Sequence, residues 1–135
     1  MTKDEIIVHC AQTPNGVDFG ILDIDKWHEE RGFNSRGLKS MFCGYNYVIR
    51  INGVIERGRG LSEVGAHTKG HNGRSIGICL IGTNEFTPAQ FKALEWLLKD
   101  LKKLYPNATI HGHYEFSNKA CPGFEVEKWV ETVKL

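Results

Sequence analysis

The sequence lacks a long hydrophobic run. Its apolar stretches, such as residues 75–82, are far shorter than the roughly 20 residues that cross a bilayer, so we expect no membrane insertion. It also lacks an excess of charge of one sign, because 17 Lys and Arg residues face 16 Asp and Glu residues for a net charge of +1. Proteins that bind nucleic acids usually carry a basic excess or stripe, and we therefore expect no nucleic-acid partner.

Paired cysteines are absent as well. The four cysteines, at positions 10, 43, 79 and 121, are scattered and form no Cys-x-x-Cys motif. The N-terminus enters a strand-like stretch within five residues, which leaves no room for a secretory signal with an apolar core and a cleavage site. We therefore expect a chain synthesised in the cytoplasm, without a signal peptide and without a disulfide framework.

Internal repeats, low-complexity tracts and linkers are also missing. The composition is that of an ordinary globular protein, with 41% hydrophobic and 24% charged residues. A chain of 135 residues is long enough to form a stable hydrophobic core without disulfide bonds or a structural metal ion. The sequence predicts one domain over residues 1–135, which we expect to be monomeric.

Segments with strand and helix patterns alternate along the chain. Strands are predicted at residues 5–10, 75–81 and 108–111, and Asn52-Gly53 predicts a tight hairpin turn between residues 45–51 and 54–57. Helices are predicted at residues 23–32, where Asp23 is the expected cap, from Pro88 to the residue before Pro106, and at about residues 125–133. For the long helix, Thr87 and Gln90 form the pattern of a capping box. The expected fold class is α/β, a single domain with a central mixed β-sheet flanked by α-helices.

One loop near the C-terminus gathers residues that suit a metal. It contains His113, Lys119 and Cys121, and a further soft ligand, His9, lies far upstream at the end of the first strand. Imidazole and thiolate suit Zn²⁺, and a catalytic zinc keeps three protein ligands and one open position. A lysine beside such a site places positive charge where an oxyanion forms. These residue types point to metal-assisted hydrolysis.

The residues alone leave alternatives open. His111 lies two positions before His113, so on an extended strand both share a face and compete as ligands. His9 and Cys10 are neighbours on a strand, so only one of them points into a given site. His28 is expected to pack and His71 to be solvated. Judged singly, Tyr45 and His67 are not distinguished from ordinary strand and loop residues.

The order of the motifs is more informative than any one of them. Read along the chain, they closely resemble the type-2 N-acetylmuramoyl-L-alanine amidases, the family of small phage lysozymes and peptidoglycan recognition proteins. The resemblance extends from about residue 5 to residue 130. The segments that carry it are Val8-His9-Cys10, Gly44-Tyr45-Asn46-Tyr47, Asn52-Gly53 with Gly58-Arg59, Val64-Gly65-Ala66-His67-Thr68-Lys69-Gly70, Ser75-Ile76-Gly77-Ile78-Cys79-Leu80, Phe86-Thr87-Pro88-Ala89-Gln90, His113-Tyr114-Glu115 and Lys119-Ala120-Cys121-Pro122-Gly123-Phe124.

The resemblance implies a zinc hydrolase that cleaves the amide bond between N-acetylmuramic acid and L-alanine in peptidoglycan. It places the metal ligands at His9, His113 and Cys121 and the catalytic residues at Tyr45, Lys119 and His67. The implied partner is the muramyl peptide, and the implied role is that of a phage or prophage endolysin, which acts on the cell wall after release or export. Basic residues at positions 36 and 39 are candidates for pairing with stem-peptide carboxylates.

Three other functions compete with this interpretation. A recognition module that binds peptidoglycan without cutting it would be expected to lose a metal ligand, whereas this chain keeps all three. A structural zinc site needs a fourth protein ligand, from Cys10 or His111. A thiol hydrolase would use Cys121 as its nucleophile with His113 as its base.

Overall fold

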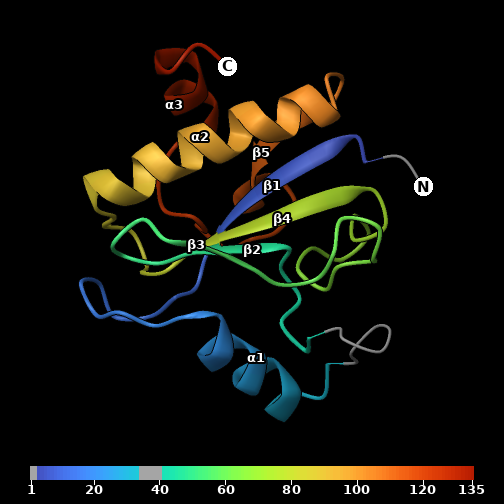
Figure 1. The fold of residues 1–135 in the computed structure, drawn as a ribbon, viewed down its shortest axis with the longest axis vertical. Helices are drawn as coiled ribbons and strands as arrows, with labels where there is room; N and C mark the ends of the chain where they lie inside the picture. Colours follow the sequence, from blue (N-terminus) through green and yellow to red (C-terminus); the bar gives the residue numbers. More distant parts are fainter. Residues whose placement is uncertain (1–2, 34–40) are drawn as a thin grey trace.

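The computed structural model describes residues 3–33 and 41–135, and its centre is one five-stranded sheet (Figure 1). The strands are β1 (Glu5–Cys10), β2 (Tyr47–Ile49), β3 (Ile55–Arg57), β4 (Ser75–Leu80) and β5 (Thr109–Gly112). Their order in the sheet is β3-β2-β4-β1-β5. All neighbours are parallel except β2 and β3, which form the antiparallel hairpin. The predicted mixed sheet is confirmed.

The two faces of the sheet are covered differently. The helices α2 (Pro88–Leu104) and α3 (Val126–Thr132) lie over one face, and α1 (Ile21–Glu30) lies on the opposite side (Figure 1). Side chains alternate between the faces, so β1 sends Ile6 and Val8 into the core under α2, while His9 points to the side of α1. The smaller core on that side includes Ile24, Cys79 and other buried residues next to α1. The predicted helical flanks are confirmed.

Local sequence signals explain most element boundaries. Thr87 Oγ1 accepts the Gln90 N–H and the Gln90 side chain accepts the Thr87 N–H, so the predicted capping box is present. The N-terminus of α1 was predicted wrongly. The helix begins at Ile21 with Gly20 as its N-cap, and Asp23 is the third helical residue, whose carboxylate accepts the Gly20 N–H. Because an acidic residue is favourable both as an N-cap and at the third helical position, the sequence placed the cap three residues too late.

Within the described residues, no helix has both the length and the apolar character needed to cross a membrane. The remaining element is η1, a single 3-10 turn over His113–Glu115 that directly follows β5. This turn redirects the chain at the end of the strand, so that the side chains of His111 and His113 no longer share a face. Because β5 and β1 are parallel neighbours with Val8 opposite Gly112, the turn begins beside His9.

Candidate metal centre and active site

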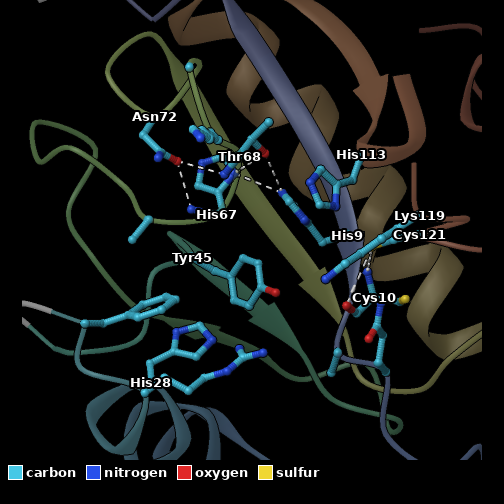
Figure 2. Close-up of a pocket in the computed structure, with 17 residues that line it drawn as sticks. His9, Cys10, His28, Tyr45, His67, Thr68, Asn72, His113, Lys119 and Cys121 are labelled. Carbon is cyan, nitrogen blue, oxygen red and sulfur yellow. Dashed lines mark hydrogen bonds between the residues drawn. The ribbon is translucent and has the colours of Figure 1, made fainter. Parts of the chain in front are cut away.

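Three side chains, one near the N-terminus and two near the C-terminus, converge at the carboxyl end of β1, which lies between β4 and β5. They are His9 at the end of β1, His113 at the start of η1, and Cys121 in the tail loop (Figure 2). One ligand atom from each lies within 4.8 Å of the others, and the ring centroids of His9 and His113 are 4.3 Å apart. His9 and Cys121 are buried and His113 is partly exposed. Two imidazoles and one thiol form a donor set that fits Zn²⁺ with one position left open.

The sulfur of Cys121 is held by the backbone of β1. The Cys10 N–H donates to Cys121 Sγ at 2.9 Å, and the Cys121 thiol lies 3.7 Å from the Cys10 carbonyl oxygen. Contact with the Cys10 thiol, followed by burial, raises the pKa of Cys121 above its ordinary value. The metal-free residue is therefore a thiol, which a metal ion would convert to a ligand by displacing the proton. A Cys121 thiolate that bound a metal ion with His9 and His113 would be engaged as a ligand and would not serve as the nucleophile of a thiol hydrolase.

Tyr45 and Lys119 border the space in front of these ligands. The Tyr45 ring centroid is 5.1 Å from that of His9, and burial, followed by the nearby cysteines, raises the Tyr45 pKa well above its ordinary value. The hydroxyl is therefore protonated at neutral pH and available as a hydrogen-bond donor. Lys119 is exposed and extends from the tail loop into the same space (Figure 2). The structure thus brings both predicted catalytic side chains to the ligand cluster.

His67 contacts His9 directly and lines the same space. Its Nδ1 atom is 2.9 Å from His9 Nε2, and burial lowers the His67 pKa to about 3, so the ring is neutral. Two glycines make room for the ring, because a Cβ atom on Gly77 or on Gly65 would lie 2.6 or 2.7 Å from His67 Cδ2. The predicted site residue therefore lies at the site, where it contacts the candidate ligand His9 through a ring nitrogen.

These residues line a cavity of about 660 Å³. A second cavity of about 410 Å³ adjoins it, and Gln12, His28 and Arg31 line both. His28 was expected only to pack, and the sequence gives no signal for its position at this junction. Arg36 and Lys39, the basic residues proposed to bind stem-peptide carboxylates, lie outside the described residues.

The other candidate histidines are bound elsewhere. His111 contacts Thr109 and Glu115, with Nδ1 3.0 Å from Glu115 Oε1, so it does not compete with His113. His71 was expected to be solvated, but its Nδ1 atom lies 2.8 Å from a carboxylate oxygen of Glu5. Within residues 3–33 and 41–135, the cluster contains three ligands and neither Cys10 nor His111, which argues against a four-ligand structural site.

The sequence model of a protein family described as N-acetylmuramoyl-L-alanine amidase matches residues 2–124. The chain belongs to this family. It is therefore an amidase, as the motifs predicted, and the enzyme interpretation is preferred to a recognition module that does not cleave its ligand.

Sequence relatives and solved structures agree with this assignment. The chain is 38% identical over 139 residues to the endolysin of Klebsiella phage KP32, covering 97% of the chain and 87% of that protein. It is 37% identical over 142 residues to the endolysin of Escherichia phage T7, covering 99% and 89%. Among solved structures, N-acetylmuramoyl-L-alanine amidase LysC from Clostridium intestinale URNW matches with a TM-score of 0.85 at 28% identity, covering 100% of the chain and 87% of LysC. Drosophila PGRP-LB matches with a TM-score of 0.79 at 26% identity, covering 97% and 81%.

Proposed function

We propose that this amidase is a zinc-dependent, peptidoglycan-lytic enzyme that hydrolyses the bond between N-acetylmuramic acid and L-alanine. The observation that supports the metal is the convergence of His9, His113 and Cys121 beside a cavity of about 660 Å³. The family supports the bond, and the endolysins among the relatives support a role in degrading the cell wall. The alternative, a module that binds muramyl peptides without cutting them, has no observation in its favour at this site.

The amide carbonyl is a poor electrophile, so the reaction needs an activated water molecule and a polarised carbonyl. A bound Zn²⁺ supplies both, since it lowers the pKa of water and acts as a Lewis acid. His9, His113 and Cys121 would hold the ion. Burial of His9 and Cys121 keeps two of the three ligands away from solvent and protects the site from competing water.

The protein's own groups then act on the substrate. Attack on the carbonyl develops negative charge on its oxygen, and the Lys119 ammonium group, which projects into the cavity, is suited to stabilise that charge. The protonated Tyr45 hydroxyl is a donor that orients either the attacking water or the oxyanion. Placing these groups in advance avoids the cost of reorganising solvent during the reaction.

Two variants separate the proposed roles. Cys121→Ser removes a ligand, so we expect lost zinc affinity and lost activity. Lys119→Ala leaves the ligands intact, so we expect zinc to stay bound while turnover falls about 10²–10³-fold, the usual cost of losing an oxyanion donor. Lys103→Ala on the exposed side of α2 is the matched control and should change neither quantity.

The measurements are zinc content by elemental analysis and release of peptides with a free N-terminal L-alanine from purified sacculi. Restoration of activity by Zn²⁺ after chelation supports the metal requirement. Unchanged cleavage in a chelator would refute zinc dependence, and loss of zinc from Lys119→Ala would refute the division of roles. Products that carry a new reducing sugar end instead of a new amine would refute the proposed bond.

A further inference from the structure

The ring nitrogen of His9 that faces the protein interior is surrounded by a small polar cluster. His9 Nε2 lies 2.9 Å from His67 Nδ1 and 3.2 Å from Thr68 Oγ1, and those two atoms lie 2.9 Å from each other (Figure 2). On its other side, His67 Nε2 lies 3.3 Å from Ser75 Oγ. A chain of contacts therefore leads from β4, through His67 and Thr68, to the metal-ligand candidate on β1.

The direction of these hydrogen bonds follows from the last contact. The Ser75 hydroxyl donates its only proton to the His71 carbonyl oxygen at 2.7 Å, so toward His67 it acts as an acceptor. His67 Nε2 must then carry the proton. A neutral imidazole has one N–H group, and His67 Nδ1 is consequently an acceptor.

The same reasoning fixes His9. Two ring nitrogens 2.9 Å apart need a proton between them, and His67 Nδ1 does not supply one. His9 Nε2 therefore carries the proton and donates it toward His67 Nδ1 and Thr68 Oγ1. The lone pair of the neutral His9 ring is then on Nδ1, the nitrogen that is free to bind a metal ion.

We propose that His67, Thr68 and Ser75 are positioning residues that hold His9 in its Nε2–H tautomer and so direct Nδ1 toward the metal. This inference rests on the proposed zinc site. It changes the role of His67 from a catalytic residue to one that acts through His9. The nearby carboxylate of Glu115 contacts His111 Nδ1 and accepts the Gly112 N–H.

The loop that carries His67 and Thr68 is fixed by hydrogen bonds to the Asn72 side chain. Asn72 Oδ1 accepts the N–H groups of both His67 and Thr68, each at 2.8 Å, and thereby fixes the backbone on either side of the contact to His9. Thr68 is only 2% exposed. The absence of a side chain at Gly77 and Gly65 lets the His67 ring pack closely against both residues. Such outer partners fix the orientation and basicity of a ligand histidine.

A pair of substitutions at one position tests the proposal. His67→Phe keeps a ring in the space between the glycines but removes the acceptor, whereas His67→Asn keeps an acceptor oxygen near the place of Nδ1. Affinity is measured with Zn²⁺ alone, by competition with a chromophoric chelator. We expect His67→Phe to bind zinc about 10–100-fold more weakly and His67→Asn to bind within about threefold of the unaltered chain. Thr68→Val should fall between them, and Thr109→Val, which removes an exposed hydroxyl, is the control.

A second readout does not depend on zinc. Nitrogen-15 NMR of the metal-free chain distinguishes the two neutral tautomers of His9, and we expect the Nε2–H form in the unaltered chain and a mixture in His67→Phe. Equal zinc affinity of the Phe and Asn variants, or an Nδ1–H tautomer in the unaltered chain, would overturn the positioning role. Failure of the unaltered chain to bind zinc, with the Nε2–H tautomer present, would instead overturn the zinc site. If His67→Phe does not fold, Thr68→Val and the NMR measurement decide the question.

Discussion

Gly77 on β4 offers the sharpest test of how the sheet supports the site. Replacing it with alanine places a Cβ atom 2.6 Å from Cδ2, 2.7 Å from Cγ and 2.8 Å from Nε2 of the His67 ring, all shorter than the 3.4 Å at which ordinary contact begins. Restoring ordinary contact requires the ring and the new Cβ atom to separate by 0.8 Å, the difference between 3.4 and 2.6 Å. Motion along the His67–His9 direction would lengthen their 2.9 Å contact to 3.7 Å, beyond hydrogen-bond range.

We expect Gly77→Ala to lower the free energy of unfolding by about 1–3 kcal/mol, the usual cost of overpacking a buried site. Urea denaturation in the presence of a chelator measures this term without metal binding. Zinc affinity, measured separately, should fall because His9 loses its acceptor. The control is the same substitution in a His67→Ala background, where no ring opposes the new Cβ atom and the cost should largely disappear. An equal loss in both backgrounds would show that strain in β4, and not the His67 ring, is responsible.

Two further predictions concern pH and the cell. Burial lowers the pKa of His28 from 6.5 to about 4, so between these values the unfolded chain binds a proton that the folded chain does not, and stability falls as the pH falls. His28→Asn keeps an acceptor for the Gly44 N–H, and urea denaturation should show that the unaltered chain loses about 2 kcal/mol more than this variant between about pH 7 and pH 5. Equal losses would contradict the assignment to His28. If the chain acts like the endolysins to which it is similar, expression in a bacterial cytoplasm should be tolerated until the membrane is permeabilised, when turbidity should drop rapidly. Lysis of cells whose membrane stays intact would argue against this route.

The sequence predicted those parts of the molecule that depend on local signals. The capping box at Thr87 and Gln90 and the turn at Asn52-Gly53 involve residues at most three positions apart, and both are present. The sequence did not predict every buried residue of the long helix α2. Gln90 is a polar residue that is buried in α2, where its side chain donates to the carbonyl oxygens of Ile49 and Ile81. A contact between a helix and two strands has no local pattern.

The candidate site was predictable for a different reason. Spacing alone left His111 and His113 as competing candidates with only a modest preference for His113, and the order of motifs decided for His113. The structure supplies the physical reason, since the 3-10 turn begins at His113 and turns it away from the direction of His111. The polar cluster behind His9 was not predictable, because it joins residues 9, 67, 68 and 75 through side-chain atoms whose proximity depends on strand register. The same limit applies to His28 at the junction of the two cavities.

The place of β1 between β4 and β5 affects the order in which the chain forms its site. Glu5 pairs with Ser75 on one side and with Thr109 on the other. The two partners of this strand therefore lie 70 and 104 residues later in the chain. Contacts of such sequence separation form slowly, because the chain must close long loops before it gains their stabilisation. A chain still being synthesised therefore cannot bring His9 to Cys121 until residue 121 has been made, which is after the last strand, β5, has been synthesised. An ion that bound these side chains would therefore bind late, and it would stabilise the whole fold.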